Sequence, residues 1–157
     1  MNLMSSDKTT ESYSLGELTT YQVGALQSSS HRALKKHKDA LLQDYGITGM
    51  QWYIIGTVLD AGEKGMRITD LAKYLDTTMA FLTNTVNLLE SKGILMRTSS
   101  SVDSRSRMVS VTAGFRPICA KIETDLREKL RESLYSKLSR EDLETYIKVI
   151  SRFTELN

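Results

Sequence analysis

The side chains that could carry out chemistry are few in this sequence of 157 residues. His31 and His37 are six positions apart on a stretch with helical periodicity, so they share no helix face and make no local metal pair. Cys119, the only cysteine, could react with oxidants, but no second cysteine could resolve a sulfenic acid, and a buried structural thiol is the alternative. No catalytic triad, phosphate-binding loop or metal-ligand spacing is present, which predicts a protein without enzymatic activity, cofactor or metal.

Positive charge gathers in two parts of the chain, although the formal net charge is only +2. The first group consists of Arg32, Lys35, Lys36 and Lys38, and the second of Arg97, Arg105 and Arg107. A net charge this small does not by itself indicate nucleic-acid binding, so any contact with DNA depends on where these groups lie. For the first group a solvated helix face is the alternative interpretation.

The elements that would position these residues begin with a long amphipathic helix. Apolar residues recur at three- and four-residue steps from about Glu17 to Tyr45, and Gly46 follows as a C-cap. Thr48 and Gln51 then have the spacing of a capping box, which predicts the start of a second helix.

The middle of the chain predicts two helices joined by a tight turn, followed by a hairpin. Met66 to Ile68 is expected to be extended, and Thr69 is expected to cap a short helix. The polar break at 76–78 leads into a further helix that ends at Gly93. The apolar segments 94–97 and 108–111, separated by the polar stretch 98–107, predict a hairpin with an extended loop.

The last third of the chain predicts two more helices. Apolar residues repeat every four positions from Ile118 to Leu138, and Pro117 indicates a late start or a kink. Ser139 and Asp142 mark a new helix N-terminus. The long N-terminal helix and these two C-terminal helices together carry more apolar surface than one small domain can cover, so we expect a homodimer.

Targeting signals are not evident. The apolar runs fall far short of the roughly 20 residues that a membrane-spanning helix needs. Residues 1–14 lack the basic flank and apolar core of a secretory signal. A flexible N-terminal tail, no membrane association and a cytoplasmic location are therefore expected.

Two motifs stand out within this order of elements. One is Ile68-Thr-Asp-Leu-Ala-Lys-Tyr-Leu75, followed by Leu82, Asn84, Leu89-Glu90 and Lys92-Gly93. The other runs from Leu95 through Asp103, Arg105 and Val109-Ser-Val-Thr112 to Gly114. With these motifs the chain resembles the MarR (multiple-antibiotic-resistance regulator) family of winged helix-turn-helix regulators. Ser104 stands where that family usually has a basic residue, and Phe115-Arg-Pro117 replaces a plain helix start.

The resemblance implies a mainly α fold with a small β-hairpin. Residues 47–114 would form a winged helix-turn-helix DNA-binding domain, and residues 15–46 and 115–157 a helical dimerisation region. The implied function is sequence-specific transcriptional regulation, with repression as the expected mode, by a homodimer on a pseudo-palindromic operator in double-stranded DNA. The alternative is a winged-helix dimer that acts through protein contacts without binding DNA.

The resemblance places a recognition helix over 77–87 and a wing over 98–107. The expected DNA-binding residues are Thr77, Thr78, Met79, Ala80, Thr83, Asn84, Asn87, Arg97, Arg105 and Arg107. Asparagine can pair bidentately with adenine, but this helix face has no Arg or Lys, so affinity would depend on phosphates and the wing. Arg105 is the candidate for a minor groove. Arg107 could pair either with Asp103 or with a phosphate.

The resemblance also implies a crevice between the two regions in which small aromatic effectors bind. Tyr45, Met50, Trp52 and Tyr53 cluster in the sequence near this crevice. An aromatic cluster can instead fill the core, and both interpretations stay open.

Overall fold

The computed structural model describes residues 18–99 and 107–155. The predicted flexible tail, residues 1–14, lies outside this part of the chain. The chain divides into two units, residues 1–34 and residues 35–157. The second unit contains the buried core and the sheet.

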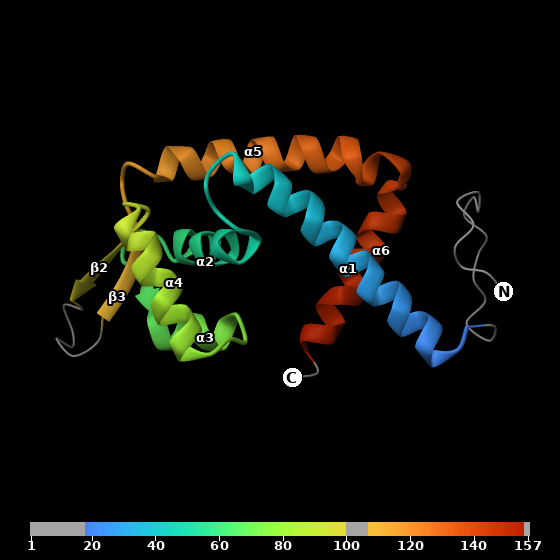
Figure 1. Cartoon of the computed structure of the whole chain (residues 1–157), viewed down its shortest axis with the longest axis horizontal. Coiled ribbons are helices and arrows are strands. Elements are labelled where there is room, and N and C mark those ends of the chain that lie inside the picture. The colour runs from blue at the N-terminus through green and yellow to red at the C-terminus, as the bar shows by residue number, and fades with distance from the viewer. Residues whose placement is uncertain (1–17, 100–106, 156–157) are drawn as a thin grey trace. The chain divides into compact units, whose positions relative to one another are not determined.

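The first helix, α1 (Thr20–Gln43), runs through the first unit and into the second (Figure 1). In its first-unit part the apolar side chains of Tyr21, Val23 and Leu26 are exposed. Gly46, which ends the following turn, has a φ of 68°, a conformation that favours glycine. The predicted long helix and its glycine stop are therefore confirmed.

The second helix, α2 (Gly49–Asp60), begins with the predicted capping box. The Gln51 amide donates to the Thr48 hydroxyl at 3.3 Å, and the Gln51 side-chain oxygen accepts from the Thr48 amide at 3.1 Å. Ile54, Ile55 and Val58 are fully buried and anchor the helix in the core.

The strand β1 (Met66–Arg67) leads directly into α3 (Ile68–Tyr74). The prediction that Thr69 caps this helix is wrong, because Arg67 occupies the N-cap position and makes no side-chain capping bond. Arg67 pairs with Met108 in the sheet, so the end of this strand fixes where the helix begins. Pairing between distant strands has thus overridden a local capping preference.

The sheet has three antiparallel strands in the order β1-β3-β2, which are the two strands of the predicted hairpin and the segment at Met66 that is predicted to be extended. The hairpin strands β2 (Leu95–Ser99) and β3 (Arg107–Val111) pair with Leu95 opposite Val111. On its other side β3 pairs with β1, where Met66 lies opposite Val109. Because β3 is central, it connects the hairpin to the start of the helix-turn-helix.

Helix α5 (Arg116–Ser133) starts late, with Pro117 in its first turn, where the missing N–H costs no helical hydrogen bond. The late start predicted from the proline is confirmed. A short turn of 3-10 helix, η1 (Tyr135–Lys137), interrupts the leucine repeat. The final helix, α6 (Arg140–Thr154), begins with the predicted Ser139–Asp142 capping box.

The core takes residues from helices α1 to α5 and from both strands of the hairpin, but none from α6. It is formed by Leu42, Ile47, Ile54, Ile55, Val58, Leu71, Ala72, Leu82, Val86, Leu89, Ile94, Leu95, Val109, Val111, Cys119, Ile122 and Leu126. Helix α6 contributes no buried residue. Among the described residues, no helix is both long and apolar enough to span a membrane.

Candidate nucleic-acid interface and adjoining pocket

Helix α4 (Met79–Ser91) packs one face against the core, and its opposite face is exposed. The Thr78 hydroxyl accepts a hydrogen bond from the Phe81 amide at 3.2 Å and so caps the helix. Leu82, Val86 and Leu89 are fully buried in the core. The helix therefore has a fixed orientation in which Asn84 and Asn87 are exposed, whereas Thr85 is buried with the apolar side chains.

The residues predicted on this helix lie on the outward face with two exceptions. The exposed ones are Thr78, Met79, Ala80, Asn84 and Asn87. Thr77 and Thr83 are half-buried. The positions 80, 84 and 87 follow one another at helical steps, which brings both asparagines onto one surface.

Two exposed apolar residues of α4, Phe81 and Leu88, were missed by the sequence analysis. They are seven positions apart, so they share one side of the helix, beside the asparagine surface. The sequence could have indicated their exposure, because neither residue belongs to the apolar spacing 82, 86 and 89 that marks the buried face.

The wing arginines lie in different surroundings. Arg97, on β2, forms an ion pair with Glu90 of α4, and its backbone amide donates to the same carboxylate at 3.1 Å. Its side chain is only 18% exposed. Arg107 is exposed at the start of β3. Arg105 and Asp103 lie outside the described residues, so the two alternatives for Arg107 stay predictions.

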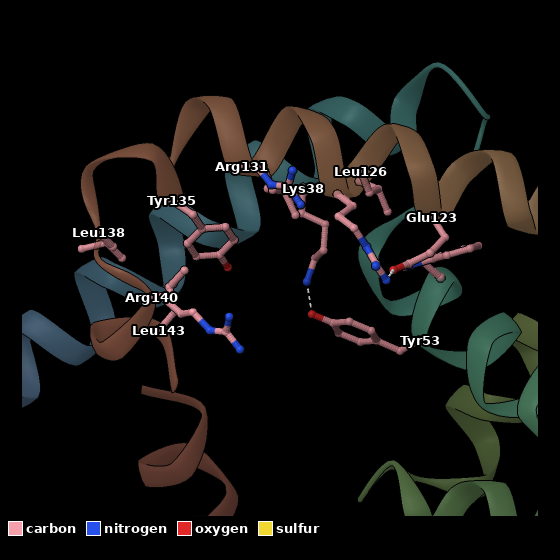
Figure 2. Close-up of a pocket in the computed structure, with 12 residues that line it drawn as sticks. Lys38, Tyr53, Glu123, Leu126, Arg131, Tyr135, Leu138, Arg140 and Leu143 are labelled. Carbon is pink, nitrogen blue, oxygen red and sulfur yellow. Dashed lines mark hydrogen bonds and ion pairs between the residues drawn. The ribbon is translucent and has the colours of Figure 1, made fainter. Parts of the chain in front are cut away.

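A pocket of about 540 Å³ lies between α2 and the α5–η1–α6 segment (Figure 2). It is lined by Lys38, Trp52, Tyr53, Glu123, Leu126, Arg127, Leu130, Arg131, Tyr135, Leu138, Arg140 and Leu143. Four of these side chains are cationic, one is anionic, and the rest are aliphatic or aromatic. A second pocket, of about 650 Å³, shares Trp52, Tyr53 and Glu123 and also reaches Cys119.

The aromatic residues predicted for the effector crevice lie in separate places. Trp52 and Tyr53 line both pockets. Tyr45 lies elsewhere: its hydroxyl donates to Asp125 of α5, and Lys121 donates to both groups, at 2.8 Å to Asp125 and 3.0 Å to Tyr45. Met50 is exposed and lines neither of the two pockets. The structure thus brings together two of the four residues.

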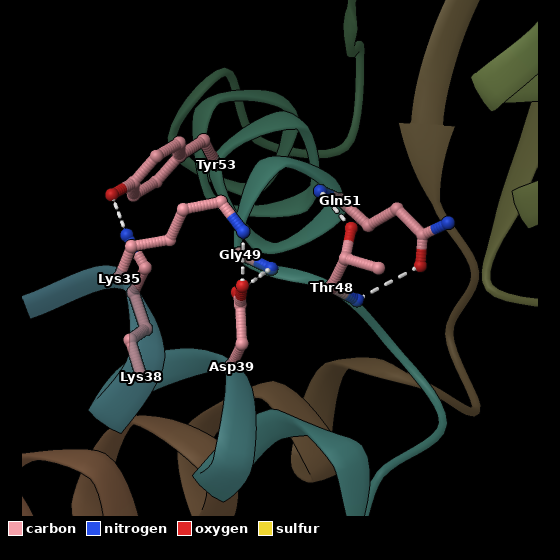
Figure 3. Close-up of polar contacts among 7 residues, drawn as sticks. All are labelled: Lys35, Lys38, Asp39, Thr48, Gly49, Gln51 and Tyr53. Carbon is pink, nitrogen blue, oxygen red and sulfur yellow. Dashed lines mark hydrogen bonds and ion pairs between the residues drawn. The ribbon is translucent and has the colours of Figure 1, made fainter. Parts of the chain in front are cut away.

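Polar contacts join the last turns of α1 to the start of α2 (Figure 3). The Lys38 ammonium donates to the Tyr53 hydroxyl and lies 4.1 Å from the centroid of the tyrosine ring. The Asp39 carboxylate accepts from the Gly49 amide at 3.0 Å and from Lys35 at 2.5 Å. The Lys35 hydrogen bond is the main reason that the pKa of Asp39 is lowered, whereas burial lowers the pKa of Lys38.

Cys119 is buried at 1% exposure, and burial raises the pKa of its thiol. A protonated, enclosed thiol reacts slowly with oxidants, which favours the structural role. Across the described ranges, no group of three or more His, Cys, Asp or Glu residues is placed to hold a metal ion.

The helix pair α3–α4 followed by the β2–β3 hairpin defines a winged helix-turn-helix protein. Residues 45–106 match the family model described as MarR family. Over these residues the chain is similar to the MarR family, and the resemblance inferred from the sequence is confirmed.

Solved structures of that family have the same fold as this chain. Wild-type MarR from E. coli in its apo form is 21% identical with a TM-score of 0.70, and the match covers 83% of this chain and 95% of MarR. MepR from S. aureus, solved with DNA, is 22% identical with a TM-score of 0.71 and coverage of 90% and 100%. A MarR family transcriptional regulator from Streptomyces coelicolor, also solved with DNA, is 22% identical with a TM-score of 0.75 and coverage of 88% of each chain.

Proposed function

We propose that this chain is a sequence-specific DNA-binding transcriptional repressor that binds a pseudo-palindromic operator as a homodimer. The observation that carries the proposal is the outward face of α4, where exposed Asn84 and Asn87 stand on a helix anchored by its opposite side. A solvated helix face usually carries Glu and Lys, whereas small polar side chains suit base edges in a major groove. A mutant of E. coli MarR, which has this fold, has been solved in complex with operator DNA.

The wing would supply the charge that α4 lacks. Because Arg97 is already paired with Glu90, Arg105 and Arg107 are the arginines that we assign to phosphates or the minor groove. In this scheme the asparagines give sequence preference and the wing gives affinity.

The homodimer is supported by apolar surface that a single copy leaves uncovered. On α6 the side chains of Ile147, Ile150 and Phe153 are 59%, 41% and 53% exposed. They share one helix face, as expected for a surface that pairs with another copy.

The proposal is tested by selecting binding sites from a random pool of double-stranded DNA of about 30 base pairs. This length accommodates two half-sites one helical turn apart. The selected sites should be pseudo-palindromic. Asn84→Ala should cost on the order of 1–3 kcal/mol on the selected site and much less on random DNA, because it removes a contact to a base edge. An equal loss on both DNAs would contradict base reading by Asn84.

The second candidate is a winged-helix dimer that acts through protein contacts. It is favoured by the uncharged surface of α4 and by the exposed Phe81 and Leu88 beside it. A folded dimer that enriches no sequence, including in a gel shift with the protein's own upstream DNA, would favour this candidate.

A small-molecule effector would bind in the pocket that Trp52 and Tyr53 line. Trp52 is the only tryptophan, so titration with aromatic acids should quench its fluorescence and release DNA together. Quenching with unchanged DNA affinity would reject the coupling.

A further inference from the structure

The first turn of α4 is apolar although it is exposed. It consists of Met79, Ala80 and Phe81, and the side chains of Met79 and Phe81 are 45% and 44% exposed. The first turn of a helix usually favours Asp or Glu, because a carboxylate compensates the partial positive charge of the free amide groups. The sequence of α4 has no charged residue before Glu90. This turn therefore offers an apolar contact surface without a carboxylate that would repel DNA phosphates.

The backbone of Phe81 is held from both sides. Its amide donates to the Thr78 hydroxyl at 3.2 Å, and its carbonyl oxygen accepts from the Thr85 hydroxyl at 2.9 Å. Thr85 is itself buried. Because both backbone groups of Phe81 are held, little backbone freedom is lost when its ring meets a partner.

Ala80 and Phe81 adjoin the asparagine surface of the same helix. Ala80 lies four positions before Asn84, and Phe81 lies three positions before it, so both side chains are neighbours of the Asn84 carboxamide on the helix surface. A carboxamide can donate and accept hydrogen bonds at the same time. The outward face therefore combines an apolar turn with a group that can form two hydrogen bonds to one base.

An A·T base pair has the matching combination of groups in the major groove. Adenine presents an acceptor at N7 and a donor at N6, which asparagine pairs with bidentately, and thymine presents a 5-methyl group that Ala and Phe side chains contact. Guanine is usually recognised by Arg or Lys, and cytosine by Glu or Asp. The only charged residue of α4, Glu90, is paired with Arg97. The exposed chemistry of this helix thus favours adenine and thymine.

We propose that Phe81, with Ala80 beside it, contacts the 5-methyl group of a thymine next to the adenine that Asn84 contacts. Leu88 shares the side of Phe81 and is equally exposed, at 45%. Phe81 is assigned the contact because recognition helices reach base edges mainly with their N-terminal residues. The inference rests on the proposed function, since it assigns a base contact to α4.

The spacing on the helix limits where this thymine lies. Residues 81 and 84 are separated by about 4.5 Å along the helix axis, and successive base pairs by about 3.4 Å along the DNA. The thymine should therefore lie within about two base pairs of the adenine.

The test replaces the thymines of one half-site of a selected operator by deoxyuridine, one at a time. Deoxyuridine keeps the base pairing and the O4 acceptor and lacks only the 5-methyl group. At the contacted thymine the replacement should weaken binding by about fourfold, as expected for one buried methyl group. The adenine is located as the position where 7-deazaadenine, which lacks the N7 acceptor, weakens binding of the wild type but not of Asn84→Ala.

Variants then assign the methyl contact to Phe81. Phe81→Ser removes the ring and should bind the thymine and uracil sites equally. Phe81→Leu keeps an apolar side chain and should retain most of the discrimination. Leu88→Ser is the matched control, because it removes an equally exposed apolar side chain two turns further along the same side, and it should discriminate like the wild type. Thermal unfolding shows whether each variant is folded, and the uracil scan of the wild type decides the methyl contact without any variant.

The outcomes separate this inference from the function on which it rests. If no site is selected, the proposed function fails and the methyl contact fails with it. If a site is selected but no uracil replacement weakens wild-type binding, the methyl contact is overturned while the proposed function stands. The assignment to Phe81 is overturned if folded Phe81→Ser still discriminates, if Leu88→Ser also loses the discrimination, or if the sensitive thymine lies far from the adenine that Asn84 contacts.

Discussion

At Gly65 the backbone φ is 65°, and a Cβ would stand 2.0 Å from the carbonyl oxygen of Val109. The close approach follows from the pairing of β1 with β3, which begins at the next residue. Gly62, three positions earlier, has a φ of 75° but nothing within 4 Å of its Cβ position. Substitutions at the two glycines therefore separate the free-energy cost of a left-handed backbone from that of a steric clash.

We predict that Gly65→Ala lowers the free energy of unfolding by about 3 kcal/mol or more, because it combines backbone strain with a backbone clash. Gly62→Ala should cost about 1–2 kcal/mol, from backbone strain alone. Urea denaturation of both variants gives the comparison. Equal losses of stability in the two variants would mean that β1 and β3 can move apart around the added Cβ without a cost in free energy.

Residue contacts were predictable from the sequence where they are local. The two capping boxes, Thr48–Gln51 and Ser139–Asp142, could be predicted because each joins positions three apart. The contacts Lys38–Tyr53, Arg97–Glu90 and Tyr45–Asp125 could not, because each depends on how separate elements pack. For the same reason the asparagine surface could be predicted from helical spacing within α4. The pocket could not, because it forms between separate elements.

At the scale of elements, Arg97 links strand β2 to helix α4. Its ion pair with Glu90 is partly buried, with side-chain exposures of 18% and 30%. Arg107, on the neighbouring strand, is exposed. The arginines of one hairpin should therefore have separable roles.

We predict that Arg97→Ala costs about 1–3 kcal/mol of stability, because it leaves the Glu90 carboxylate without its charged partner. Arg107→Ala should change stability by less than about 0.5 kcal/mol and reduce the salt dependence of DNA binding by about one unit. Thermal unfolding and binding at several salt concentrations measure both. An unchanged salt slope in Arg107→Ala would remove Arg107 from the interface.

A second link between elements, Tyr45–Asp125–Lys121, predicts a pH dependence. Hydrogen bonds, first from Lys121 and then from Tyr45, hold the pKa of Asp125 below its usual value. A lowered pKa stabilises the folded protein above the unfolded pKa of about 3.9, and this contribution is lost as the pH falls through the folded pKa.

Asp125→Asn should therefore be less stable than the wild type at pH 6, and the difference in Tm should shrink as the pH falls below about 4. Glu128→Gln, which removes a charge elsewhere on α5, is the control. A difference that persists at the lowest pH at which both proteins fold would contradict the assignment.

At the scale of the whole molecule, the exposed apolar face of α6 is the surface through which we propose that two copies assemble. We predict that changing Ile147 and Ile150 together to Asp yields a monomer at micromolar concentration, because charges would be buried in an apolar contact. Thr145 and Lys148, at the same spacing on the opposite side of the helix, changed to Asp, form the matched control. Size-exclusion chromatography with light scattering distinguishes them, and an unchanged oligomer in the first variant would exclude α6 from the interface.

The central place of β3 also constrains how the protein is made. Both strand partners of β3, β1 and β2, are synthesised before it, so the sheet cannot close until residue 111 has left the ribosome. Until then the helix-turn-helix has its helices but lacks the strand that joins β1 to β2. Domains generally fold as units during synthesis. Nascent chains arrested before β3 emerges should therefore be cleaved by protease between α2 and α4, whereas chains arrested well after it should resist.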